Sequence, residues 1–115
     1  MLLSQVLEKY MPDEGTVREL VDFFGIFSHE TRIRILNLLS ISEFCVNDIV
    51  FALKLNQTTV SHQLKTLRDA RVIDCKRDGK RIIYFMTNDK INDLFSVALQ
   101  ASEQCSFHDT FEQFA

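Results

Sequence analysis

Five polar side chains between residues 57 and 65 have the types and spacing of a hydrogen-bonding surface. Val60, Leu64 and Leu67 recur at i, i+4 and i+7, which predicts an amphipathic helix over Gln57–Ala70. The polar residues lie off this apolar stripe, toward the start of the helix: Gln57, Thr58, Ser61, His62 and Lys65. Glutamine can pair with adenine, serine and threonine can bond bases or phosphates, and lysine can meet phosphate. An ordinary surface helix with a polar outer face is the alternative.

A second group of candidate side chains is basic and follows directly. Val72–Cys75 and Arg81–Met86 are short β-type runs, and Asp78-Gly79 between them predicts a β-hairpin because glycine reaches positive φ at little cost. The basic residues at or beside the hairpin tip are Lys76, Arg77, Lys80 and Arg81. Cations in such a place could hold a nucleic-acid backbone or enter a minor groove, and that binding would weaken steeply with salt.

The distribution of charge agrees with this grouping. The whole chain has a net charge of -3, yet residues 56–81 hold seven basic residues against three acidic ones. The rest of the chain holds six basic residues against thirteen acidic ones. A basic segment in an acidic frame indicates one face that attracts polyanions, with ordinary solvated surface charges as the alternative.

The three cysteines are the remaining reactive side chains. Cys45, Cys75 and Cys105 are odd in number and contain no CxxC pair, so we expect thiols in a reducing compartment rather than a disulfide framework. Cys45 and Cys105 would meet if the end of the last helix packs near the start of the helix at Val46. That approach would make a thiol sensor or a partial metal site. The alternative is that each cysteine is a small apolar filler.

Apolar spacing predicts the elements that position these groups. The expected helices are Leu2–Tyr10, one capped by Asp13, a central one starting at Ser28, Val46–Lys54, Gln57–Ala70 and a last one from Asn88 or Asp89. Two short helices joined at Leu55-Asn56 and followed by a hairpin have the order of a winged helix-turn-helix, whose second helix enters the major groove. We therefore expect a mainly α fold with one β-hairpin (α+β), in a single domain over residues 1–115.

The last helix has more apolar surface than one packing face requires. Its apolar residues are Ile91, Leu94, Phe95, Val97, Ala98 and Leu99. Such a surface requires a partner, either a second copy of the chain or the helix around Val17–Phe24 of the same chain.

Three stretches within residues 28–86 carry a specific resemblance to a known family. SHETRIRILNLL, FCVNDIVFALKLNQTTVSHQLKTLRDARVI and KRDGKRIIYFM closely resemble the ArsR/SmtB family of winged-helix repressors. The resemblance implies a homodimer paired through its first and last helices. It also implies binding to double-stranded operator DNA with two-fold symmetry, and release when an effector binds. That effector would be a metal ion or a thiol-reactive species.

The effector sites known from this family are only partly present. Its arsenic and cadmium sensors carry two cysteines one residue apart in the stretch that here is residues 44–48, and only Cys45 is present. Its zinc and nickel sensors place an aspartate and a histidine on the last helix, and here Asp93 is followed by Phe95. Ser106 and Asp109 occupy the positions of the answering histidine and acidic residue. The sequence therefore leaves the metal site and the identity of the effector unknown.

Other classes of protein have less support. No Gly-rich phosphate loop, GxSxG or HExxH is present, so we do not expect an enzyme. The apolar runs are far shorter than the ~20 residues of a membrane helix, and Glu8 interrupts any signal peptide, which favours the cytoplasm. The competing function is a winged helix that binds a protein instead of DNA. It is favoured by the overall acidity and by Arg71, where the family commonly has the glycine that ends a helix cheaply.

Overall fold

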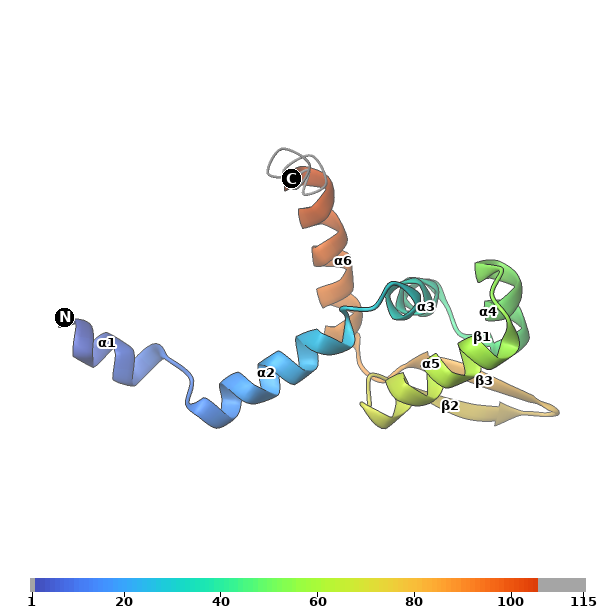
Figure 1. Cartoon of the computed structure of the whole chain (residues 1–115), viewed down its shortest axis with the longest axis horizontal. Coiled ribbons are helices and arrows are strands. Elements are labelled where there is room, and N and C mark those ends of the chain that lie inside the picture. Colours follow the sequence, from blue (N-terminus) through green and yellow to red (C-terminus); the bar gives the residue numbers. More distant parts are fainter. Residues whose placement is uncertain (1, 106–115) are drawn as a thin grey trace.

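The structure, a computed structural model, describes residues 2–105, which form six helices and a small three-stranded sheet. In chain order the elements are α1 (Leu3–Tyr10), α2 (Glu14–Ile26), α3 (Glu30–Ile41), β1 (Phe44–Cys45), α4 (Val46–Leu53), α5 (Gln57–Asp69), β2 (Ile73–Asp78), β3 (Arg81–Met86) and α6 (Asp89–Cys105). Figure 1 shows α1 and α2 reaching out to one side, the hairpin β2–β3 projecting to the other, and α6 standing away from both. The shape is accordingly elongated, at 61 × 36 × 21 Å.

Local side-chain chemistry explains where α2 and α5 begin. The Asp13 carboxylate accepts a hydrogen bond from the Thr16 backbone N–H at 2.7 Å, and the Asn56 amide oxygen accepts one from the Thr59 N–H at 2.7 Å. Both predicted caps are confirmed. The predicted start at Ser28 is wrong by one residue, because the N-cap of α3 is His29, which makes no side-chain cap. The Ser28 hydroxyl instead donates to the Phe24 carbonyl at 3.3 Å, in the last turn of α2.

The sheet is larger than the predicted hairpin. Strands β2 and β3 pair antiparallel from Ile73↔Met86 to Asp78↔Arg81, which leaves Gly79 and Lys80 as the two-residue turn. Gly79 takes φ 63°, the conformation for which glycine was expected here. The third strand, β1, was not predicted, and it pairs with β3 to give the order β1-β3-β2. Two residues are too few to show the alternation by which a strand is recognised in sequence.

One core holds together the segment from α3 to the first turns of α6, residues 30–95, which we call the body. Its side chains with 0% exposure come from α3, α4 and α5: Ile35, Leu36, Ile49, Val60, Leu64 and Leu67. Ile91 and Phe95 bring the start of α6 into the same cluster. The recognition of a helix-turn-helix with a wing is thereby confirmed, since α4, α5 and the hairpin occupy adjacent places on this core.

The first two helices, residues 3–26, form a second region that we call the arm. Neither α1 nor α2 contributes a buried residue. The apolar stripe of α2, from Val17 to Phe24, remains 44% to 65% exposed. Val97 and Leu99 of α6 are also exposed, at 60% and 45%. The end of the arm meets α6 where Phe24 lines a cavity with Leu94 and Ala98, but within the described chain the arm leaves Val97 and Leu99 uncovered.

Candidate nucleic-acid interface

Helix α5 has one face fixed in the core and the opposite face in solvent. Val60, Leu64 and Leu67 are 0% exposed, as their spacing predicted. All five polar candidates of this helix are exposed: Gln57, Thr58, Ser61, His62 and Lys65. The first four lie in its first two turns, behind the Asn56 cap. The exposed start of α5 therefore presents hydrogen-bonding groups of the kinds that read base edges.

Gln63 also belongs to the inward face of α5, which sequence reasoning missed. Its side chain is 8% exposed, and its Oε1 accepts a hydrogen bond from Arg32 Nε of α3 at 2.9 Å. A buried amide without a partner would be costly, so this bond ties the rotation of α5 to α3. The spacing Val60, Gln63, Leu64, Leu67 was the available signal, since Gln63 occupies an i+3 position on the stripe.

The wing, which is the hairpin of β2 and β3, contains basic residues that differ in their ion pairing. Arg77 and Lys80 are exposed and form no ion pair within residues 2–105. Lys76 is paired with Glu43 at 3.0 Å and lies 5.5 Å from the centre of the Phe85 ring. Within the described residues the wing thus offers two cations without an ion pair, while Lys76 is partly neutralised.

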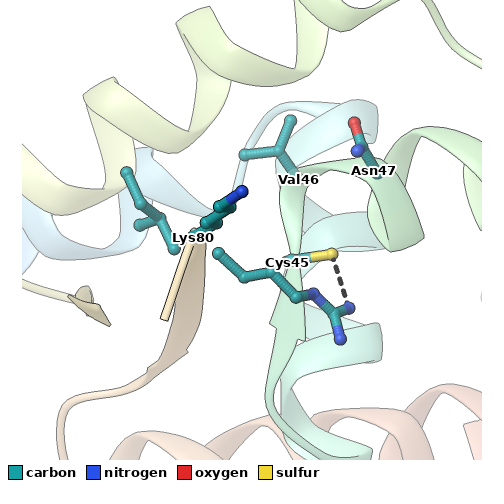
Figure 2. Close-up of a pocket in the computed structure, with 6 residues that line it drawn as sticks. Cys45, Val46, Asn47 and Lys80 are labelled. Atoms are coloured by element: carbon teal, nitrogen blue, oxygen red, sulfur yellow. Dashed lines mark hydrogen bonds between the residues drawn. The ribbon is translucent and has the colours of Figure 1, made fainter. Parts of the chain in front are cut away.

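Arg81 has a different environment from the other wing cations. Its Nη2 donates to Asp48 Oδ2 and to Cys45 Sγ, both at 3.0 Å, and the Cys45 thiol donates to the same carboxylate oxygen at 3.1 Å. We call these three residues the Cys45–Asp48–Arg81 cluster. Cys45 lines an open cavity of about 240 Å³. Figure 2 shows Cys45 at this cavity, with the hydrogen bond that its sulfur accepts from Arg81 as a dashed line. Lys80 and Asn47 also line this cavity.

The contacts within the cluster favour the charged forms of both Asp48 and Arg81. The hydrogen bond from the Cys45 side chain is the main cause that lowers the pKa of Asp48, and the nearby Arg81 charge adds to it. The hydrogen bond to Cys45 and the charge of Asp48 in turn raise the pKa of Arg81. Asp48 is therefore a carboxylate and Arg81 a cation at neutral pH, and each favours the charge of the other.

The predicted thiol sensor has only one described member. Cys45 is a free cysteine, 7% exposed, at the N-cap of α4. Cys105 is the last residue of α6, and its side chain lies outside the described part of the structure. Ser106 and Asp109 lie outside it as well. The structure therefore describes the Cys45 half of the predicted pair.

No group of three or more His, Cys, Asp or Glu that could hold a metal ion occurs within the described residues. Asp93 is exposed on α6, whereas Phe95, at the position where metal sensors carry histidine, is 5% exposed and packs in the core. Phe95 therefore has a packing role at that position. Within residues 2–105 no helix is both long and apolar enough to cross a membrane.

Comparison with known proteins supports the architecture and the sequence resemblance. Residues 29–74 match the family model described as "Bacterial regulatory protein, arsR family". The chain is 36% identical over 83 residues to the cadmium resistance transcriptional regulatory protein CadC of Listeria innocua, which covers 71% of this chain and 70% of that protein. It is 30% identical over 78 residues to a transcriptional repressor SmtB homolog of Synechocystis, of which it spans 59%.

Solved structures agree with this assignment. The crystal structure of Mycobacterium tuberculosis Rv0081 superposes with a TM-score of 0.76 at 29% identity, covering 85% of this chain and 99% of that one. The antimony-specific transcriptional repressor AntR gives a TM-score of 0.76 at 25% identity, covering 92% and 96%. The chain therefore belongs to the arsR family of bacterial regulatory proteins, a family of winged helix-turn-helix transcriptional regulators rather than enzymes.

Proposed function

We propose that this chain is a transcriptional repressor that binds operator DNA as a homodimer and is released by an effector. The observation that carries the proposal is the exposed polar start of α5, held in place by a fully buried inner face and flanked by a basic wing. Its relatives include proteins named as repressors, among them the Synechocystis SmtB homolog and AntR. A repressor of this kind acts by binding rather than by catalysis, and it meets its operator in the cytoplasm.

The exposed side chains divide into two roles on DNA. Those at the start of α5 lie where a recognition helix meets base edges in the major groove: Gln57, Thr58, Ser61 and His62. Lys65, Arg77 and Lys80 would contact phosphates, which fix the register of the protein and give affinity without reading sequence. Two such units related by a two-fold axis would read two half-sites of a symmetric operator.

Dimerisation would cover the apolar surface that the single chain leaves in solvent. That surface includes Leu3, Leu7, Val17, Leu20, Val21, Phe24, Val97 and Leu99. These residues come from α1, α2 and α6, the first two helices and the last helix of the described chain. Burial of these residues against a second copy would make α1, α2 and α6 the dimerisation helices of a single DNA-binding domain over residues 1–115.

The effector would act through cysteine. Cys45 stands at the junction of β1 and α4, and its thiol bonds to both Asp48 and the wing residue Arg81. A metal ion or a thiol-reactive compound that reaches Cys45 would therefore alter contacts near the DNA-binding surface, and Cys105 is the second candidate target. A Cys45→Ser, Cys105→Ser protein tested with cadmium, zinc, arsenite and a small disulfide would fail to release DNA. Full release from DNA in that variant would remove cysteine from the mechanism.

Fluorescence anisotropy with a labelled duplex from upstream of the gene tests the proposal as a whole. We expect saturable binding by the reduced protein that weakens steeply as the salt concentration rises. Gln57→Ala and His62→Ala should change the preference among DNA sequences, whereas Lys80→Ala should weaken binding to all sequences alike. Absence of DNA binding, or binding insensitive to salt, would instead favour the module that binds a protein.

A further inference from the structure

Arg81 differs from its neighbours in the wing because its side chain turns toward α4. All three cations are exposed, Arg81 with 60% of its side chain, but Arg77 and Lys80 have no ion pair among the described residues, whereas the Arg81 guanidinium has two acceptors at 3.0 Å. The third side of the triangle, from the Cys45 thiol to Asp48, closes it at 3.1 Å. Three side chains from three elements are therefore joined at one point.

The cluster lies near the tip of the wing, where no backbone pairing joins the hairpin to the rest of the body within the described residues. Strand β1 pairs with β3 only at Phe44↔Tyr84 and Cys45↔Ile83. Beyond Ile83 toward the tip, the backbone of β3 pairs only with β2. Arg81 is two residues further along, opposite Asp78, and its side chain extends the attachment to the first turn of α4. The cluster thus fixes the tip half of the hairpin to the helix that braces α5.

Charge gives a second reason to separate Arg81 from the other wing cations. A guanidinium that already lies against a carboxylate is neutralised, so a phosphate would have to displace Asp48 to gain its full attraction. Lys80, the preceding residue, has no such partner within the described chain. Within the described chain Lys80 is therefore a cation without an ion pair, whereas the adjacent Arg81 is paired with a carboxylate.

We propose that Arg81 is a positioning residue that fastens the wing to α4 through Asp48 and Cys45, and that it is not itself a DNA contact. The inference rests on the proposed function, because the wing orientation that it sets matters when α5 and the wing meet DNA together. It assigns Asp48, an acidic residue beside a DNA-binding surface, a role in holding the wing in place.

The test is the salt dependence of binding to a labelled random-sequence duplex of roughly three helical turns, with Lys80→Ala as the matched control. The plot of log K against log salt has a negative slope, and removal of one phosphate contact reduces the magnitude of that slope by about 0.9. We expect that decrease for Lys80→Ala. For Arg81→Ala and for Asp48→Asn we expect an unchanged slope and affinity that is lower by about two- to fivefold at every salt concentration. The double variant should lose no more than either single one.

Three results would overturn the proposal. A slope for Arg81→Ala that falls as it does for Lys80→Ala would make Arg81 a phosphate contact. Tighter binding by Asp48→Asn would mean that Asp48 withholds Arg81 from DNA. Additive losses in the double variant would show that the two residues act independently. Circular dichroism spectra and melting curves of each variant ensure that the comparison concerns folded proteins.

Hydrogen exchange of the free protein tests the attachment without DNA. We expect Arg81→Ala and Asp48→Asn to speed exchange of the backbone amides of residues 81–84 to the same extent, and the double variant to match them. Unchanged exchange would overturn the attachment even if DNA binding is normal. If the wild-type protein does not bind the duplex, the proposed function fails, and the exchange result still decides whether the wing is fastened in this way.

Discussion

The body and the arm are built from similar residues, yet they bury their apolar side chains to very different extents. The body has a continuous core in which Leu64 and Ile35 are 0% exposed, whereas the arm has no buried residue. Helix α1 has only eight residues, and helices of that length are marginal in water without tertiary contacts. The comparison indicates that the body is stable within one chain and that the arm needs a further surface to pack against.

The largest effect should come from the core of the body. Leu64→Ala should lower the free energy of unfolding by about 2–5 kcal/mol, because it removes a fully buried side chain of the recognition helix. Leu20→Ala in the arm, where the side chain is 45% exposed, should lower it only at protein concentrations that support a dimer. Urea unfolding at two protein concentrations measures both. An equal loss for Leu20→Ala in dilute protein would show that the arm packs on its own body.

Charges placed on the exposed apolar surface of the arm and α6 should weaken dimerisation without unfolding the body. Val21→Asp combined with Val97→Asp should weaken dimerisation at least about 100-fold, or ~3 kcal/mol, because each dimer would bury unpaired carboxylates. Sedimentation velocity measures the change. In the single chain these positions are 65% and 60% exposed, so the monomer itself should remain folded.

Phe51→Asp is the control for that experiment. Phe51 is an apolar residue of the body that is 85% exposed, more than any of the apolar residues in the arm. If the interface involves the arm and α6, this substitution should leave the dimer unchanged. Loss of the dimer in Phe51→Asp, with a normal dimer in the Val21 and Val97 variant, would place the interface on the opposite side of the molecule.

The sequence predicted the features that depend on neighbours along the chain. The caps at Asp13 and Asn56, the inward stripe of α5 and the turn at Gly79 all arise within a few residues, so their signals are local. Most elements, and the family itself, could therefore be recognised from the sequence. The polar candidates on α5 were found in the same way, because an apolar stripe defines the face opposite to it.

Contacts between distant residues left no such signal. Arg32 and Gln63 are 31 residues apart, and Arg81 and Asp48 are 33 apart, so neither pair could be inferred from spacing. Arg81 was consequently grouped with Arg77 and Lys80 on charge alone, although only the structure shows that its charge is paired. Strand β1 is similar, since two residues become a strand only because β3 lies beside them.

Backbone strain provides a smaller effect that is also confined to the body. Among the described residues, the non-glycine residues with positive φ are Lys54 at 56° and Arg71 at 63°. Arg71 occupies the position where the Val72 and Arg71 amides bond back to the Leu67 and Arg68 carbonyls, which is the place of glycine in a Schellman motif. Arg71→Gly should therefore stabilise the protein by about 1 kcal/mol, seen as a higher melting temperature.

Two further substitutions decide whether strain is the cause. Lys54→Gly should stabilise by a similar amount, because Lys54 has the same left-handed conformation at the end of α4. Lys65→Gly, at an exposed position inside α5, should destabilise by about 1 kcal/mol, since glycine there only weakens the helix. A lower melting temperature for Arg71→Gly would mean that contacts of the arginine side chain outweigh the strain of its backbone.

The smallest expected effect is the pH dependence of stability that comes from one carboxylate of the arm, Asp13, and one of the body, Asp48. Hydrogen bonds lower the pKa of both below the ordinary value of 3.8: chiefly the Thr16 N–H for Asp13, and the Cys45 side chain for Asp48. A lowered folded-state pKa means that each group stabilises the fold above pH 3.8 and that this contribution is lost as the pH falls through the folded-state pKa. Acid should therefore loosen the start of α2 and the attachment of the wing as the pH falls below 3.8.

A side-chain NMR titration can separate the two carboxylates. Cys45→Ala should raise the pKa of Asp48 toward its ordinary value and leave that of Asp13 unchanged, because Asp13 is held by its own helix. Arg81→Ala should raise the pKa of Asp48 less, since the Arg81 charge is a smaller cause of its depression than the thiol bond. If Arg81→Ala had the larger effect, the ion pair would hold the Cys45–Asp48–Arg81 cluster together, and a reaction at Cys45 would leave the wing attached.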